Sequence, residues 1–338
     1  MGQRGDALVE RVLITGATGF IGRHLVRHFL SAGRPLTLAV RDAGGCPPDW
    51  RNREQIKIVA TGPIETATNL GEALAEVSTV IHLAGLAHVR HVAGADDPFV
   101  AANTTATQRL AKAATDHEVG TFVHLSSLAA ITQNASPTIV DDSTCDPPPT
   151  PYGRTKREAE KHVLALAEDG IFAVSLRPPL VVGAEAKGNW GALQRIAVTG
   201  LPLPFASVGN RRSLIGIDSL VAAVAHLCTG QWPAEKSGNY CLADEERFPL
   251  PRIVSELRQG MGLAPRLFPF PAAILDAAAR MAGRGHMARA LLGDLQVDAS
   301  RFRETFGFAQ SHGLAASIAE SGRQYRRLRS GGAGGHAQ

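Results

Sequence analysis

The stretch Pro-Tyr-Gly-Arg-Thr-Lys contains Tyr152 and Lys156, whose separation along the chain corresponds to about one turn of a helix. On a helix, this spacing places both side chains on one face. An ammonium group beside a phenol favours the phenolate, and so lowers the tyrosine pKa from its usual value of about 10. Such a tyrosine can exchange the proton of an alcohol/ketone pair. Exposed helix faces show the same spacing, so the pair indicates chemistry only together with other motifs.

A glycine-rich motif follows a short apolar run near the start of the chain. Residues 11–15 read Arg-Val-Leu-Ile-Thr, which predicts a buried strand, and a helical pattern begins near residue 20. Between them, Gly16, Gly19 and Gly22 recur at every third position. Glycines at such a junction allow a tight turn and let the backbone approach a pyrophosphate at the helix N-terminus. The motif therefore predicts a dinucleotide site.

The elements that position these residues alternate between strand and helix patterns. Strands are expected near residues 10–15, 36–40, 56–60, 79–83, 121–126 and 172–177, and helices near 20–32, 69–76, 97–117 and 151–168. This alternation predicts an α/β fold with a Rossmann-type doubly wound parallel sheet. Ligands of such sheets bind at the carboxyl ends of the strands, where these motifs fall.

The pattern loosens after about Leu180. We expect a dinucleotide-binding domain over residues 9–180 and a smaller, mostly helical substrate-binding region over 181–329, whose strand and helix near 213–229 pack back on the core. The Gly-rich residues 330–338 are expected to be a disordered tail.

The segment 271–293 is alanine-rich and amphipathic. Packing on the sheet or on a partner subunit is the simplest interpretation of this pattern. Peripheral membrane contact is the alternative.

Composition narrows the class of protein. The 338 residues carry a formal net charge of +4, too small and too scattered to indicate nucleic-acid binding. The four cysteines are widely spaced, which predicts free thiols in a reducing compartment. No apolar leader or membrane-spanning stretch occurs, so a cytoplasmic enzyme is expected.

His82 is interpreted as a packed strand residue. His88, His91 and His124 lack companions at the spacing of metal ligands, so no metal is expected.

Four short motifs follow one another along the chain: Thr-Gly-Ala-Thr-Gly-Phe-Ile-Gly from residue 15, His-Leu-Ala-Gly from 82, Leu-Ser-Ser from 125 and Tyr-Gly-Arg-Thr-Lys from 152. Together they resemble the extended short-chain dehydrogenase/reductases of the NAD-dependent epimerase/dehydratase family, over roughly residues 10–328. The resemblance implies that Ser127 binds the reacting oxygen and that Tyr152 is the general acid/base. Lys156 would lower the tyrosine pKa and hold the nicotinamide ribose. Spacing leaves Ser126 open as the alternative to Ser127, which we favour as the second serine of the pair.

The same resemblance implies a set of cofactor-binding residues: Gly16, Thr18, Gly19, Phe20, Ile21, Gly22, Arg41, Leu83, Ala84, Gly85, Asn103, Tyr152, Lys156 and Pro179. Asn103 could equally be an N-cap or a buried polar contact. One element departs from the family pattern, because residues 61–64 read Thr-Gly-Pro-Ile without the usual adenine-binding acid.

The second half contains Arg-Pro-Pro-Leu-Val-Val-Gly from residue 177, Lys-Gly-Asn-Trp from 187 and Gly-Asn-Arg-Arg-Ser-Leu from 209. These stretches resemble the branch that acts on sugar nucleotides in O-antigen synthesis. That likeness implies that Asn189 and Arg212 bind the diphosphate of a UDP-sugar. The expected reaction is reduction of a UDP-4-keto-6-deoxy-N-acetylhexosamine; a UDP-hexose 4-epimerase with tightly bound NAD is the alternative. A homodimer through the helices near 97–117 and 151–168 is a further expectation.

The end of the second strand bears on the choice between these reactions. Arg41 directly follows Val40, where a basic residue accommodates the 2′-phosphate of NADP(H) and an acid would favour NAD(H). Asp42 keeps NAD(H) open. Two other classes are disfavoured: a non-enzymatic dinucleotide sensor by the intact Ser, Tyr and Lys, and a reductase of apolar molecules by Asn189 together with Arg211 and Arg212.

Overall fold

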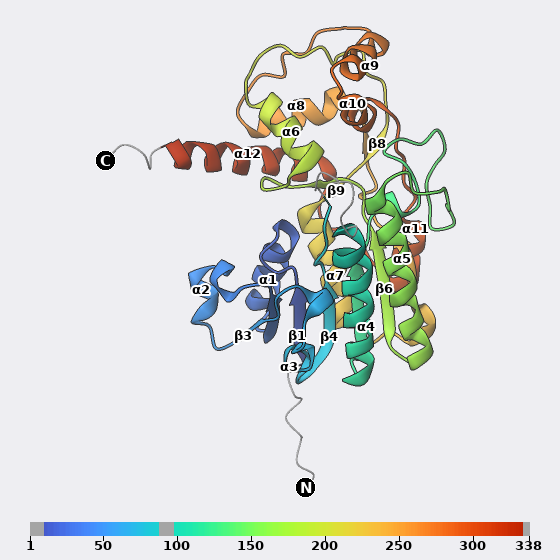
Figure 1. Cartoon of the computed structure of the whole chain (residues 1–338). Helices are drawn as coiled ribbons and strands as arrows, with labels where there is room; N and C mark the ends of the chain where they lie inside the picture. Colours follow the sequence, from blue (N-terminus) through green and yellow to red (C-terminus); the bar gives the residue numbers. More distant parts are fainter. Residues whose placement is uncertain (1–9, 88–97, 334–338) are drawn as a thin grey trace. The chain divides into compact units, whose positions relative to one another are not determined.

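The computed structural model describes residues 10–87 and 98–333. Its central element is a seven-stranded sheet with the order β10-β6-β5-β4-β1-β2-β3 (Figure 1). The strands are β1 (Arg11–Thr15), β2 (Leu36–Val40), β3 (Ile56–Ala60), β4 (Val77–His82), β5 (Thr121–Leu125), β6 (Phe172–Arg177) and β10 (Gly238–Cys241). Each neighbouring pair from β6 to β3 is parallel. The Rossmann-type sheet predicted from the alternating pattern is confirmed.

Helices cover both faces of this sheet because successive strand residues point to opposite sides. Leu13 and Phe122 belong to one buried cluster together with Leu110 and Val163, which come from helices. Val12 and Ile14 face the other way and are fully buried, and helix α1 packs against β1 and β2. The helices after the first strands are α1 (Phe20–Ser31), α2 (Pro48–Arg51), α3 (Leu70–Leu74), α4 (Ala106–Asp116) and α5 (Pro151–Ala165). A π-helical segment, Val100–Thr105, leads into α4.

The chain forms two compact units that are interleaved in sequence. The first comprises Met1–Ser126, Thr155–Leu176 and Val224–Asn239, and the second comprises Ser127–Arg154, Arg177–Ala223 and Tyr240–Gln338. The division therefore does not follow a single boundary near residue 180. The units are defined by contacts in space and not by position in the sequence. Strand β6, for example, pairs with β10, which lies some sixty residues further along the chain.

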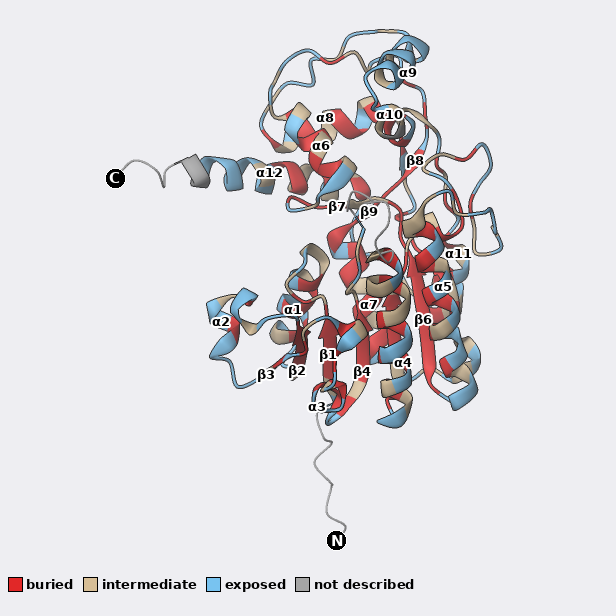
Figure 2. Ribbon diagram, in the orientation of Figure 1, coloured by how far each residue is buried: buried red, intermediate tan, exposed pale blue. Residues whose placement is uncertain are grey.

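The second unit is mostly helical, with two small two-stranded sheets. β7 (Val181–Val182) pairs with β9 (Ile215–Gly216), and β8 (Arg212–Ser213) pairs with β11 (Arg247–Phe248). Its helices are α6 (Gly188–Ala197), α8 (Leu250–Gly260), α9 (Ala272–Met281), α10 (Gly285–Leu292), α11 (Ser300–Phe306) and α12 (Leu314–Ala333). Helix α7 (Ile217–Thr229) contributes to both units. Figure 2 shows the buried residues of α6, α8 and α12, which share a core around Trp190.

Two features of the C-terminal region add to or depart from what the sequence predicts. The amphipathic segment 271–293 is two helices, since the chain turns at Gly283, whose φ of 69° lies in the left-handed region. Helix α12 continues to Ala333, so residues 330–333 are helical where a tail was expected; residues 334–338 lie outside the described residues. Within 10–87 and 98–333, no helix combines the length and apolarity needed to cross a bilayer.

Candidate active site

The glycine-rich turn between β1 and α1 forms one wall of a pocket of about 450 Å³ in the first unit. Gly16 has a φ of 71°, and a Cβ there would lie 2.8 Å from the backbone nitrogen of Ala84. A Cβ at Gly22 would overlap the Gly16 carbonyl oxygen. Only glycine therefore allows both the turn and the close packing of α1 on it. Of the expected cofactor residues, Gly16, Thr18, Gly19, Arg41, Leu83, Ala84 and Gly85 line this pocket.

These features fit a dinucleotide. The pocket lies at the carboxyl ends of β1, β2 and β4, where backbone N–H groups at the start of α1 favour a pyrophosphate. The backbone at Ala84 and Gly85 also forms part of its wall. A side chain at Gly85 would meet the Asn103 amide oxygen at 2.8 Å, so the glycine is needed there as well.

The rim after β2 carries both charged residues named by the sequence. Arg41 is exposed and lines the pocket. The Asp42 carboxylate accepts a hydrogen bond of 2.9 Å from the Gly44 backbone and so caps a short 3-10 turn. Glu65 also lines the pocket. This acid lies just beyond the Thr-Gly-Pro-Ile stretch, and sequence reasoning missed it because that stretch lacks the usual motif.

The two adjacent serines have different partners. The buried Ser126 hydroxyl donates a 2.6 Å hydrogen bond to the carboxylate of Glu160. Ser127 is hydrogen-bonded to the Tyr152 hydroxyl, and its Oγ accepts the Ala129 backbone N–H at 3.1 Å. The side chain that meets the tyrosine is thus the second serine of the pair.

Helix α5 approaches the turn at residues 128–130 closely. A Cβ at Gly153 would overlap the Ala129 carbonyl oxygen, so glycine after Tyr152 lets the helix start against this turn. Tyr152, Lys156 and Glu160 follow one another at four-residue steps along α5 and share one face. That spacing could have identified Glu160 from the sequence.

The pKa of Tyr152 differs from the sequence expectation. Burial raises it above its usual value of 10, and the hydrogen bond with Ser127 acts in the opposite direction. The expected lowering by Lys156 is therefore not observed in this structure, because desolvation of the phenolate outweighs the favourable interactions. The neutral phenol is the stable form.

The Lys156 ammonium is held beneath the carboxyl end of β5. Its Nζ donates to the Leu125 carbonyl oxygen at 2.8 Å and lies 3.4 Å from Nε2 of His124. Burial lowers the lysine pKa to about 8, while the charge of Glu160 raises it. Sequence reasoning found no role for His124, although a histidine inside an apolar strand is the available signal.

Two strand histidines lie below this lysine. His82 and His124 are fully buried and stacked, with ring centroids 5.7 Å apart. Burial, followed by the charge of Lys156, lowers both pKa values, that of His82 to about 3. Both ring nitrogens of His82 are hydrogen-bonded: Nδ1 to the Thr15 hydroxyl at 2.7 Å and Nε2 to the Thr107 hydroxyl at 2.9 Å. His82 is thus a neutral packing residue.

Asn103 lies in the π-helical segment and is buried. Its amide oxygen accepts the Leu86 N–H at 2.7 Å, and its nitrogen donates to the Leu86 carbonyl at 3.0 Å and to Thr155 at 3.1 Å. These bonds tie the loop after β4 to helix α5. The arrangement matches the buried polar contact that the sequence left open.

The two expected substrate residues lie in the second unit. Asn189 is half-buried in the first turn of α6. The Arg212 guanidinium is buried and donates to the carbonyl oxygens of Gly293 at 2.7 Å and Asn134 at 3.2 Å. Burial lowers the Arg212 pKa to about 10, while Asp294 raises it.

Three further observations concern Pro179, metal binding and the cysteines. Pro179 is buried in the second unit, two residues after the end of β6. Among the described residues, no group of three His, Cys, Asp or Glu side chains could hold a metal ion; His88 and His91 lie outside them. All four cysteines are free thiols, as predicted.

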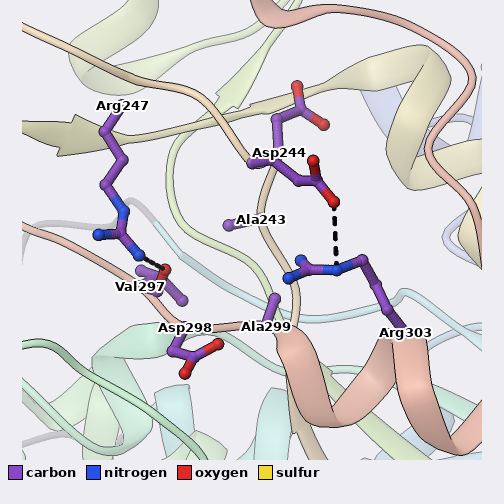
Figure 3. Close-up of a pocket in the computed structure, with 8 residues that line it drawn as sticks. Ala243, Asp244, Arg247, Val297, Asp298, Ala299 and Arg303 are labelled. Atoms are coloured by element: carbon purple, nitrogen blue, oxygen red, sulfur yellow. Dashed lines mark hydrogen bonds and ion pairs between the residues drawn. The ribbon is translucent and has the colours of Figure 1, made fainter.

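A separate pocket of about 300 Å³ in the second unit contains none of the expected site residues (Figure 3). Its charged side chains are engaged with neighbours: Arg303 pairs with Glu245 at 3.3 Å, and Arg247 donates to the Val297 carbonyl at 3.1 Å. Asp298 accepts the Ser300 N–H at 2.9 Å. These contacts join the loop after β10 to α11.

Comparison with known proteins agrees with this geometry. Residues 12–238 match the NAD dependent epimerase/dehydratase family. The chain belongs to this family. As a member, it is 31% identical over 316 residues to a UDP-glucose 4-epimerase of Vibrio cholerae, covering 90% of this chain and 92% of that protein. It is also 31% identical over 264 residues to a ceramide reductase of Caulobacter vibrioides, covering 77% and 73% respectively.

Solved structures share the fold of this family member. MoeE5 in complex with UDP-glucuronic acid and NAD superposes with a TM-score of 0.73 at 24% identity, covering 94% of this chain and 99% of that one. The resemblance to extended short-chain dehydrogenase/reductases is confirmed.

Proposed function

We propose that this protein is an NAD(P)-dependent oxidoreductase acting at C4 of a UDP-sugar, and that it reduces a UDP-4-keto-6-deoxy-N-acetylhexosamine in O-antigen synthesis. The hydrogen-bonded pair Ser127 and Tyr152 carries the chemical part of the proposal. A bound nicotinamide cofactor would supply the hydride. Tyr152 donates the proton to the carbonyl oxygen, Ser127 orients that oxygen, and Lys156 holds the cofactor ribose.

Arg212 supports the part of the proposal that concerns the substrate, namely that it is a nucleotide sugar. Two of its five N–H groups reach carbonyl oxygens, and it forms no ion pair with a described residue. Arg258 is buried too, but its Nε and both terminal nitrogens all reach carbonyl oxygens. Asp294 acts on this guanidinium only through its charge, and a buried cation with spare donors is further stabilised by an anionic ligand. This favours a diphosphate over an apolar substrate.

The rim of the cofactor pocket supports NADP(H). The exposed Arg41 guanidinium lines this pocket and would pair with a 2′-phosphate, whereas the Asp42 carboxylate is engaged by Gly44. An exchangeable NADPH suits one-way reduction. The expected result is tighter binding of NADPH than of NADH, with Arg41→Ala abolishing the difference in a fluorescence titration.

A 4-epimerase is the second candidate, favoured by the identity to the Vibrio cholerae protein. The same Tyr152 would then remove and return the proton at the C4 oxygen. The two candidates differ in whether reducing equivalents are consumed overall. The deciding experiment is to denature the purified protein and identify any dinucleotide released. Retained NAD, together with interconversion of C4 epimers, would establish the epimerase.

Tyr152→Phe tests the chemistry shared by both candidates. Removing the hydroxyl leaves the ring packing but eliminates the proton donor, so turnover should fall by about 10²-fold or more. Cofactor affinity should remain close to the wild-type value. Turnover by the variant at the wild-type rate would exclude this mechanism.

Arg212→Ala tests the substrate class. UDP should bind at least about tenfold more weakly, because a charge-assisted contact is lost. The adjacent Arg211, whose side chain is exposed, provides the matched control as Arg211→Ala. Unchanged UDP affinity in Arg212→Ala, measured calorimetrically on folded protein, would favour an apolar substrate.

A further inference from the structure

Helix α9 exposes apolar residues on its outward face. Ala273, Ile274, Ala277, Ala278 and Met281 are all exposed, and their spacing places them on one side of the helix. Ile274 is 53% and Met281 85% exposed. A surface helix normally presents polar side chains to solvent. No residue of α9 is buried, and Figure 2 shows the helix exposed along most of its length.

Two neighbouring loops extend this apolar face. Leu201 is 64% exposed and Phe268 41% exposed, and the loop bearing Phe268 leads directly into α9. The Phe268 N–H donates to the Leu203 carbonyl at 3.0 Å, so the two loops lie side by side. We call the outward face of α9 together with Leu201 and Phe268 the α9 surface.

The two loops of the α9 surface are joined by a buried arginine. The fully buried Arg258 guanidinium donates to Leu201 of one loop at 2.7 Å and to Pro265 of the other. Its Nε also reaches the Ala197 carbonyl at 3.1 Å, at the end of α6. On the inner side, Ala272 packs against the core of the second unit. The apolar side chains are thus held outward by the fold.

The charge of this segment is strongly one-sided. Residues 263–293 contain four arginines, at 266, 280, 284 and 289, and a single acid, Asp276. Asp276 pairs with Arg280 on the same helix. Arg284 and Arg289 are exposed and form no ion pair with any described residue. An apolar face with an arginine excess is typical of a helix that lies in a membrane interface.

We propose that the α9 surface docks this protein reversibly on an anionic lipid bilayer. Ile274, Met281, Phe268 and Leu201 enter the boundary between head groups and acyl chains, and the arginines pair with lipid phosphates. A second copy of this chain fits less well, because two such surfaces would bring like charges together. This inference does not depend on the proposed function.

Vesicle co-sedimentation of the full chain tests the proposal. The protein should bind vesicles of phosphatidylcholine mixed with phosphatidylglycerol more tightly than vesicles of phosphatidylcholine alone, and added salt should weaken binding. The double variant Ile274→Ser/Met281→Ser should bind at least about tenfold more weakly, since two apolar side chains no longer insert. Arg284→Glu should weaken binding to the anionic vesicles about fivefold or more.

Leu328→Ser is the matched control. Leu328 is 56% exposed on α12, outside the α9 surface, so vesicle binding should not change. Thermal unfolding of each variant verifies the fold, and turnover on a soluble UDP-sugar without vesicles should be unchanged, which separates this proposal from the proposed function. Absence of binding to both vesicle types would overturn it. So would dimers in light scattering that dissociate in the Ile274/Met281 variant, or turnover lost in that variant without vesicles.

Discussion

At the scale of single residues, two adjacent hydroxyls have different hydrogen-bond partners. Ser127 meets Tyr152, while Ser126 donates to the buried Glu160. Ser127→Ala should therefore lower kcat by about 10²-fold with little loss of stability, because it removes the proposed contact to the reacting oxygen. Ser126→Ala should instead lower stability by about 1–3 kcal/mol, because the buried Glu160 carboxylate loses one hydrogen-bond donor. Steady-state kinetics and urea unfolding of both variants distinguish the roles; equal kcat losses would contradict the assignment.

A second prediction at this scale concerns pH. The Lys156 pKa is lowered to about 8 by burial, so the ammonium is present below pH 8 and is lost as the pH rises through that value. If this ammonium holds the cofactor ribose, cofactor affinity should fall several-fold between about pH 7 and pH 9. Lys156→Met should bind weakly throughout and show no such step. A wild-type affinity independent of pH over this range would contradict the role.

At the scale of elements, glycines set how closely helices approach. A Cβ at Gly260 in α8 would overlap the Ala319 carbonyl oxygen of α12, and one at Gly322 would overlap the Leu257 carbonyl. Alanine usually stabilises a helix by about 1 kcal/mol over glycine. Here Gly260→Ala should destabilise by about 1–3 kcal/mol, because the helices must separate. Gln259→Ala, an exposed neighbour, is the control in urea unfolding; a more stable Gly260→Ala would show that the helices do not touch there.

At the scale of the whole molecule, each compact unit is assembled from separate chain segments. A fragment of residues 1–180 lacks Val224–Asn239 of the first unit and the β10 strand that pairs with β6. It would expose β6 as an apolar edge, which favours aggregation. We expect this fragment to aggregate or to unfold without a cooperative thermal transition by circular dichroism. A transition as sharp as that of the full chain would contradict the interleaved organisation.

The sequence by itself determined six of the seven strands of the sheet, but not β10, together with the glycine turn and the placement of Tyr152 and Lys156 on one helix. These depend on local periodicity and short spacing, which propagate directly into backbone geometry. Only the tertiary structure gave Ser126 and Ser127 different hydrogen-bond partners, raised the Tyr152 pKa and buried Arg212. It also decided which segments form each unit and which face of α9 is exposed. These properties depend on burial and on partners remote in the chain, and spacing along the sequence carries no information about either.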